Sequence, residues 1–299
     1  MNVLDSVWLE QSKKDKIIKE IILTADFETA YYTVCKYITC RSLQPLHASI
    51  IHNVSDNQAS MDLAPRGHGK STIGDVDFCI TKVLRNPDIR IMIGSKTQTQ
   101  ASAFLKEIRT HFEQNVNLIR IFGDWKKSRD NVWNDKEFTV NRRTVIKKEA
   151  TVSALGASGA VVSKHFDIII GDDLVGFENA RTEDQRKVLK EWFYSSLYPT
   201  LEPDGEIHIL GTRYSPMDLY EDLIKSKNYK INVQQAITVK DGQEYSLWES
   251  KFSLEKLRSI REEAGLIIFN MQYQNNTELA KGKICLLYTS DAADEARSV

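Results

Sequence analysis

The chain has few of the residues that mark fibrous, secreted or membrane proteins. Only 6 prolines and 14 glycines occur among its 299 residues, which excludes a collagen-like or linker-dominated composition. The cysteines form no CxxC pair, so we expect neither a zinc ribbon nor a disulfide framework, and free thiols fit a reducing cytoplasm. No apolar run is long enough to span a bilayer, and positions 1–10 contain no basic stretch followed by an apolar one. We therefore expect neither a membrane segment nor a secretory signal.

The chain also lacks an excess of either charge. It holds 40 Lys and Arg against 41 Asp and Glu, a formal net charge of −1. This balance argues against a protein that coats nucleic acid, although it is compatible with a local basic groove. Apolar residues make up 41% of the chain, enough for a sizeable core, and the length favours one large domain or two small ones.

Predicted strands and helices alternate along the chain. Short apolar runs predict strands at 60–64, 90–95, 166–171, 206–211 and 230–236. Helical spacing and capping residues predict helices at 26–43, 71–84, 97–115, 182–192 and 253–264, and one that begins at Ser215-Pro216. Residues 132–153 alternate loosely and predict an antiparallel hairpin at a sheet edge. The whole pattern predicts an α/β fold with a mostly parallel sheet flanked by helices.

The strongest motif is Ala64-Pro-Arg-Gly-His-Gly-Lys-Ser-Thr72. Its end, Gly-Lys-Ser, is that of a P-loop, and it lies between a predicted strand and a predicted helix, as this motif requires. Backbone N–H groups of such a loop converge on phosphate oxygens at a helix N-terminus. Ala64 departs from the general pattern, which has a glycine there. The predicted ATP-binding residues are Pro65, Arg66, Gly67, His68, Gly69, Lys70, Ser71 and Thr72. Lys70 is expected to reach the outer phosphates, and the Ser71 hydroxyl to bind Mg²⁺.

A second motif, Phe166-Asp-Ile-Ile-Ile-Gly-Asp-Asp173, ends a predicted buried strand with two carboxylates. This is a Walker B pattern, at the sheet edge where ligands bind in open α/β folds. Asp172 is expected to hold Mg²⁺ through water, and Asp173 to orient and deprotonate the attacking water. Glu178 is an alternative base.

A third motif, Leu210-Gly-Thr-Arg-Tyr-Ser-Pro216, follows the next predicted strand. Thr212 is expected within reach of a γ-phosphate or of the activated water, which makes it a candidate sensor. Arg213 has two interpretations, a phosphate contact or support of its own loop.

Taken in this order, the three strand ends resemble the large terminase subunit of tailed bacteriophages. The motifs resemble its modified Walker A, its Walker B and its coupling motif, respectively. Residues 248–253 and 271–276 resemble the segment that leaves the ATPase domain of that family, and the resemblance runs from about Ser42 to Ile284.

The resemblance implies an ATP-driven motor that translocates double-stranded DNA into a procapsid in the host cytoplasm. It implies a P-loop NTPase fold of the additional-strand, catalytic-carboxylate type, with a small helical segment at the N-terminus. ATP and Mg²⁺ are the implied cofactors. Arg66 and Lys70 would contact phosphate, Ser71 and Asp172 would bind Mg²⁺, Asp173 would activate water and Thr212 would couple hydrolysis to movement. The implied partners are the viral portal protein, the small terminase subunit and further copies of the chain in a ring on the portal, with no membrane.

The resemblance also divides the chain. Residues 1–44 would be an N-terminal helical segment, 45–245 the ATPase domain, and 246–284 a linker to the family's nuclease domain. Nuclease activity is not expected of this chain, since that domain would begin after Lys283. Residues 285–299 resemble the translation of a sequencing adaptor, and we do not expect them to belong to the natural protein.

Several interpretations stay open. Another P-loop nucleic-acid ATPase or helicase, or a nucleotide-binding scaffold without turnover, are alternative functions. Arg129, Arg142 and Arg181 are candidates for the arginine that completes the family's site. The basic residues at 126–129, 142–143 and 147–148 could contact DNA phosphates, but a solvated surface is the favoured interpretation.

Overall fold

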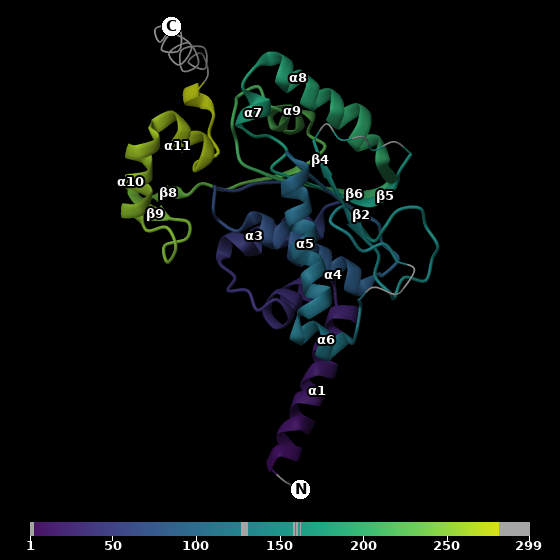
Figure 1. Ribbon diagram of the computed structural model, residues 1–299. Coiled ribbons are helices and arrows are strands. Elements are labelled where there is room, and N and C mark those ends of the chain that lie inside the picture. The colour runs from purple at the N-terminus through teal and green to yellow at the C-terminus, as the bar shows by residue number, and fades with distance from the viewer. Residues whose placement is uncertain (1–2, 127–130, 158, 160, 162, 281–299) are drawn as a thin grey trace, which may run out of the picture.

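A computed structural model describes residues 3–126, 131–157, 159, 161 and 163–280 of the chain. The interpretations of Arg129 and of residues 285–299 lie outside the described residues. Figure 1 shows a central sheet covered by helices, a long N-terminal helix and a small lobe formed by the last described elements.

Seven strands form the central sheet, in the order β3-β4-β2-β5-β6-β1-β7. Their bounds are β1 Ala59–Leu63, β2 Ile91–Ser95, β3 Glu137–Phe138, β4 Val152–Gly156, β5 Phe166–Asp172, β6 Leu201–Gly211 and β7 Lys230–Val233. All neighbouring strands are parallel except β3 and β4, which confirms the predicted α/β fold. β6 lies between the strand before the P-loop and the strand that carries the acidic pair, which is the additional-strand arrangement.

The predicted hairpin over 132–153 is right only at its outer strand. β3 is the antiparallel edge strand, but β4 is an inner strand that pairs in parallel with β2. The reason is burial: Val152 and Ala154 of β4 belong to the main core, so this strand cannot lie at a solvated edge.

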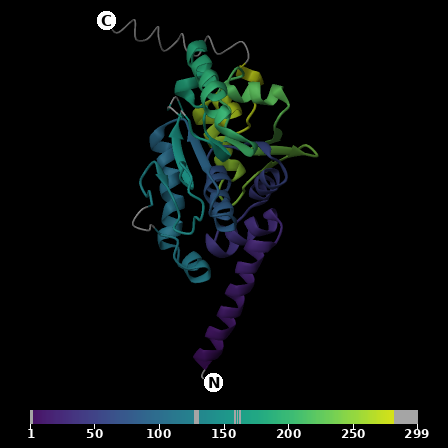
Figure 2. The same cartoon turned by 90° about the vertical axis from the view of Figure 1, so that its right-hand side faces the viewer.

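One face of the sheet is covered by the first half of the helices (Figure 2). They are α1 Val3–Thr24, α2 Phe27–Thr33, the π-helix η1 Val34–Ile38, α3 Pro45–Asp56, the π-helix η2 Thr72–Asp77, α4 Phe78–Arg85, α5 Gln98–Gln114 and α6 Val116–Phe122. Their apolar side chains pack on Ile91, Ile93, Ile168 and Ile170 of the sheet.

The other face is covered by later helices. They are α7 Phe177–Ala180, α8 Glu183–Trp192, the π-helix η3 Phe193–Leu197, the 3₁₀ turn η4 Tyr198–Thr200 and α9 Leu219–Ser226. They pack on Met92, Ile169, Ile207 and Ile209, so consecutive strand residues are buried on opposite faces. No helix of the described part of the chain is both long and apolar enough to cross a membrane.

Side-chain caps fix several helix starts. Thr97, Thr182 and Ser253 accept hydrogen bonds from the backbone of α5, α8 and α10 (Leu254–Ala264), as capping residues do. The predicted helix start at Ser215-Pro216 is wrong. The carboxylate of Asp218 accepts hydrogen bonds from the N–H groups of Ser215 and Glu221, so Pro216 lies in a turn and α9 begins at Leu219.

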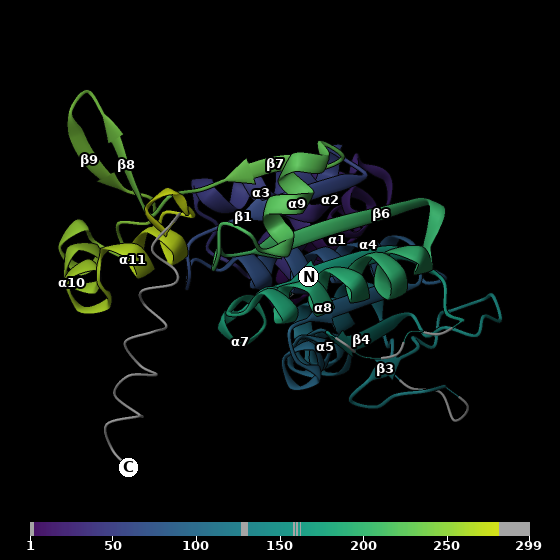
Figure 3. The same cartoon turned by 90° about the horizontal axis from the view of Figure 1, so that it is seen from above.

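The last described elements form a lobe of their own, seen apart from the sheet in Figure 3. It contains the hairpin β8 Ile237–Lys240 and β9 Gln243–Ser246, the helices α10 Leu254–Ala264 and α11 Leu266–Gln272, and the 3₁₀ turn η5 Glu278–Ala280. Its small core is built on Ala236, Ile237, Leu257 and Phe269. We call residues 237–280 the C-terminal lobe.

Candidate nucleotide-binding site

The P-loop leaves the carboxyl end of β1 and enters η2. Gly67 and Gly69 both have φ of +76°, a conformation that residues with a side chain rarely adopt. A Cβ atom on Gly69 would lie 3.0 Å from Nε2 of His47, and one on Gly67 would lie 3.0 Å from Cζ of Phe252. The two glycines are therefore required both by the turn and by close neighbours.

The P-loop lysine meets the second Walker B carboxylate. Nζ of Lys70 donates to Oδ2 of Asp173 at 3.0 Å, and the lysine is only 7% exposed. Burial alone would lower the pKa of Lys70, but the carboxylates of Asp173 and Asp172 raise it above its usual range. Lys70 is thus a firmly charged group. Asp173 has φ of +43°, a left-handed conformation that Asp tolerates better than most residues.

The P-loop serine meets the first carboxylate. Oγ of Ser71 donates to Oδ1 of Asp172 at 3.0 Å, and Asp172 is completely buried. Burial, followed by the charge of Asp173, raises the pKa of Asp172 to about 7. The P-loop and the Walker B motif, whose residues are about a hundred positions apart in the sequence, therefore form one cluster.

Unpaired oxygens gather around this cluster. Among the described residues, Oδ2 of Asp172, Oδ1 of Asp173 and both carboxyl oxygens of Asp75 are buried without a hydrogen-bond partner. The Ser95 hydroxyl is also buried without a partner, and Ser95 pairs with Asp172 across the β2–β5 ladder. Oxygen donors are the ligands that Mg²⁺ prefers, so these residues fit a magnesium ion.

The third motif, which follows β6, contacts the start of the P-loop. The hydroxyl of Thr212 is buried and donates to the carbonyl oxygen of Ala64 at 3.1 Å, which ties the end of β6 to the start of the P-loop. Arg213 is 5% exposed and pairs with Glu221 at 2.8 Å while also donating to the carbonyl oxygen of Ser215. Of its two interpretations, the structure therefore shows the support of its own loop.

Arg66 points toward the C-terminal lobe. Its guanidinium donates to Oε1 of Gln272 at 3.0 Å, and its backbone N–H donates to the carbonyl oxygen of the same residue at 3.0 Å. The neighbouring Pro65 carbonyl accepts from the N–H of His68, and Thr72 is the first residue of η2.

Aromatic side chains of the C-terminal lobe cover the P-loop. Phe252 stacks on the His68 ring with centroids 4.5 Å apart and an interplanar angle of 10°. Trp248 packs edge-on against His47, and Nζ of Lys251 donates to the carbonyl oxygen of Gly67 at 2.7 Å. His68 is fully buried, so it fills a position between the loop and the lobe. Sequence reasoning missed His47, Trp248, Lys251 and Phe252 as parts of this site, although residues 248–253 carry part of the family resemblance.

No family model matches the chain. Over 279 residues it is 25% identical to the large terminase subunit of Enterobacteria phage T3, in an alignment that covers 82% of this chain and 45% of that protein. This chain therefore spans less than half the length of that relative. Solved structures of large terminases resemble the fold. One is a mutant of the large terminase ATPase domain of Thermus phage P74-26, with a TM-score of 0.55 and 12% identity over 80% of this chain and 96% of that one. The resemblance to large terminase subunits is confirmed.

The comparisons also locate the match within large terminases. The HK97 bacteriophage large terminase has a TM-score of 0.51 and 15% identity, and the match covers 86% of this chain but only 55% of that protein. By contrast, nearly all of the isolated P74-26 ATPase domain is covered. At these identities the structural likeness shows the fold alone, and that fold is the one of a large terminase ATPase domain.

The candidate arginines of the terminase-like site have other contacts. The guanidinium of Arg142 donates to the carbonyl oxygen of Phe122 at 2.6 Å and lies over the Trp125 ring. Arg181 lies over the Phe177 ring.

Glu178, the alternative base, has a 76% exposed side chain and lies 3.9 Å from Lys96. Lys148 donates to the carbonyl oxygen of Ser163 and Arg143 to that of Glu149, and both interpretations of the basic residues at 126–129, 142–143 and 147–148 stay open.

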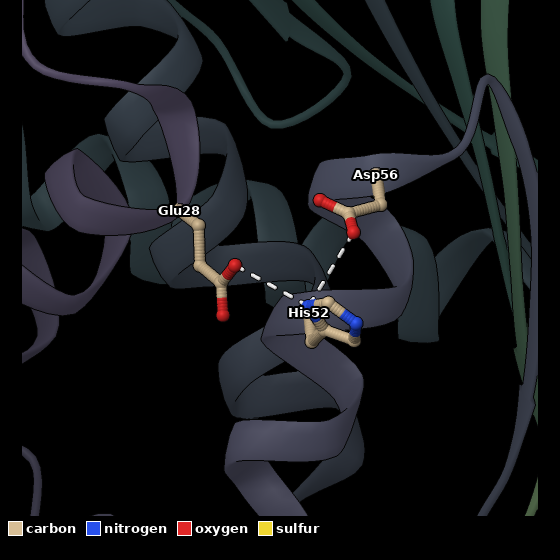
Figure 4. A group of neighbouring side chains, drawn as sticks. All are labelled: Glu28, His52 and Asp56. Atoms are coloured by element: carbon tan, nitrogen blue, oxygen red, sulfur yellow. Dashed lines mark hydrogen bonds and ion pairs between the residues drawn. The ribbon is translucent and has the colours of Figure 1, made fainter.

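A second group of possible metal ligands lies on α2 and α3, beyond His47 along α3. Figure 4 shows His52 between Glu28 and Asp56, with Nδ1 at 3.3 Å and 3.5 Å from their carboxylates. All three side chains are about one-third exposed or more, and an ion pair between α2 and α3 accounts for the geometry. We assign no ligand to it.

Proposed function

We propose that this chain is the ATP-hydrolysing part of a DNA-packaging motor that translocates double-stranded viral DNA into a procapsid. The meeting of Lys70 and Ser71 with Asp173 and Asp172 carries the proposal. A P-loop cation, a P-loop hydroxyl and two strand-end carboxylates are the groups that phosphoryl transfer to water requires.

Binding of ATP would exchange internal partners for phosphate oxygens. Nζ of Lys70 would move from Oδ2 of Asp173 to the outer phosphates, and Arg66 would leave Gln272 for the same negative charge. Ser71 and Asp172 would hold Mg²⁺, which supplies positive charge to the phosphate oxygens. The backbone N–H groups of the loop between the two glycines would complete the cradle.

Release of Lys70 would also free the general base. Asp173 would then accept a hydrogen bond from the attacking water and take its proton as the water oxygen bonds to the γ-phosphorus and the bond from that phosphorus to the β-phosphate oxygen breaks, so that ADP leaves. Thr212 would couple this event to the sheet through the backbone of Ala64. Hydrolysis at the sheet edge would thus change the contacts of the P-loop with the ends of two strands, β5 through Asp173 and β6 through Thr212.

The partners follow from the relatives and are part of the proposal. We propose double-stranded DNA, the viral portal protein, the small terminase subunit and a homo-oligomeric ring on the portal, in the host cytoplasm. We also keep the division into 1–44, 45–245 and 246–284, with the addition that residues 246–280 cover the P-loop.

The test is ATP hydrolysis by the full chain with Mg²⁺, with and without double-stranded DNA. We expect Lys70→Ala to reduce kcat by roughly a hundredfold or more, because a buried cation aimed at the transferred group stabilises the transition state. Hydrolysis that persists in Lys70→Ala would contradict the P-loop assignment. Wild-type protein that binds ATP but never turns it over would favour the scaffold function instead.

A further inference from the structure

The first turn of α3 carries a buried histidine, His47, whose ring nitrogens have two different partners. The N-cap residue of the helix is Gln44, and its backbone N–H donates to Nδ1 of His47 at 3.0 Å. A ring nitrogen that accepts a hydrogen bond carries no proton, so the proton of the neutral ring is on Nε2. The start of the helix therefore fixes the tautomer of His47.

The protonated nitrogen of this ring faces the P-loop. Nε2 of His47 lies 3.0 Å from the carbonyl oxygen of His68 and, with the tautomer fixed, donates to it. Trp248 of the C-terminal lobe packs edge-on against the His47 ring, with centroids 5.0 Å apart, and so helps to hold its orientation. Gly69 leaves room for the contact, since a Cβ atom there would lie 3.0 Å from the same nitrogen. The hydrogen bond is thus built into a closely packed and buried setting.

This hydrogen bond orients one peptide group of the loop. The peptide that joins His68 to Gly69 is planar and trans, so its N–H points away from the atom that holds its C=O. The N–H groups of Arg66 and His68 already donate to backbone carbonyls. Among the described residues, by contrast, no backbone carbonyl accepts the N–H of Gly69. That N–H is therefore available to a phosphate oxygen.

We propose that His47 is a positioning residue of the P-loop, whose Nε2–H holds the carbonyl of His68 so that the N–H of Gly69 faces the bound phosphates. A donor that is oriented before ATP arrives costs little ordering on binding, which raises affinity. The inference rests on the proposed function, since it concerns how the same loop holds ATP.

Two substitutions separate the P-loop contact from the helix start. His47→Asn places an acceptor near the position of Nδ1 and keeps the bond from Gln44, but it has no donor that reaches His68. His47→Gln instead places an amide N–H near the position of Nε2 and keeps the bond to His68. A role in starting α3 alone would spare His47→Asn, whereas the proposed role spares His47→Gln.

The experiment measures the affinity of the full chain for a non-hydrolysable ATP analogue with Mg²⁺, by calorimetric titration, together with the unfolding temperature. We expect His47→Asn to bind the analogue roughly tenfold more weakly than wild type, and His47→Gln to stay within about threefold of it. His52→Asn, at an exposed position on the same helix, is the control and should leave the affinity unchanged.

A measurement on the wild-type chain tests the same contact without a substitution. ¹⁵N NMR of histidine-labelled protein should show His47 with a proton on Nε2 and none on Nδ1. A proton on Nδ1, or wild-type affinity in folded His47→Asn, would overturn the inference alone. So would equal losses in the Asn and Gln variants, since the ring itself would then matter rather than its Nε2–H. Wild-type protein that does not bind the analogue would overturn the proposed function, and this inference with it.

Discussion

Asp62 in β1 is a buried carboxyl group with neutral partners. Its oxygens accept from Nδ2 of Asn53 at 3.1 Å and from Nδ2 of Asn232 at 2.7 Å. Burial raises the pKa of Asp62 to about 7, since two amide hydrogen bonds lower it by less than desolvation raises it. Its folded state therefore holds a proton that the unfolded chain has lost between about pH 4 and pH 7.

This difference sets the sign of a pH dependence. Because the folded state binds more protons in that window, the Asp62 contribution to the free energy of unfolding falls as pH rises from about 4 to about 7. We expect urea unfolding of Asp62→Asn to lose part of this slope, on the order of a few kcal/mol across the window. Asp56→Asn, an exposed carboxyl at the end of α3, is the control and should keep the slope. Equal slopes in wild type and Asp62→Asn would contradict the assignment.

At this scale the sequence carried the chemistry but not the contacts. The sequence could predict a grouping at one edge of the sheet for Lys70, Ser71, Asp172 and Asp173, because the carboxyl ends of parallel strands share that edge. The direction of the Thr212 hydroxyl could not be predicted, since its acceptor is a backbone carbonyl and every residue has one.

Among the elements, the C-terminal lobe matters most for the site. Its contacts reach the P-loop through a ring stack, a lysine-to-carbonyl hydrogen bond and the pair of bonds between Arg66 and Gln272. These contacts join residues about 180 or more positions apart, and neither helical periodicity nor capping chemistry carries information about them. The predicted strands and helices on either side of the P-loop were right because their signals are local.

The cover can be tested at its centre. We expect Phe252→Ala to weaken ATP binding by about fivefold, because loss of an aromatic stack of about 1 kcal/mol frees the loop that carries Gly67 and His68. Tyr245→Ala, an exposed aromatic on β9 in the same lobe, is the control. Calorimetric titration with ATP measures both variants, and equal affinities for Phe252→Ala and wild type would argue against a role of the lobe in shaping the P-loop.

In the whole molecule, the sheet edge that carries the candidate nucleotide-binding site lies between two layers of helices and the C-terminal lobe. Order along the chain did not reveal that Walker A and Walker B strands are separated by β6, although the predicted strand types and the family resemblance were consistent with it. The β1 and β5 side chains are buried on both faces, which marks them as inner strands but carries no information about which strand lies beside them.

The proposed hydrolysis depends on Asp173 acting as the base once Lys70 has turned to phosphate. The most direct test measures ATP binding and ATP hydrolysis together for Asp173→Asn in the full chain, with exposed Asp184→Asn as control. We expect Asp173→Asn to bind ATP at least as tightly as wild type, because Lys70 loses the negative charge of its internal partner, and to hydrolyse it roughly a hundredfold or more slowly. Hydrolysis by Asp173→Asn at the wild-type rate would contradict the role of Asp173 as the base.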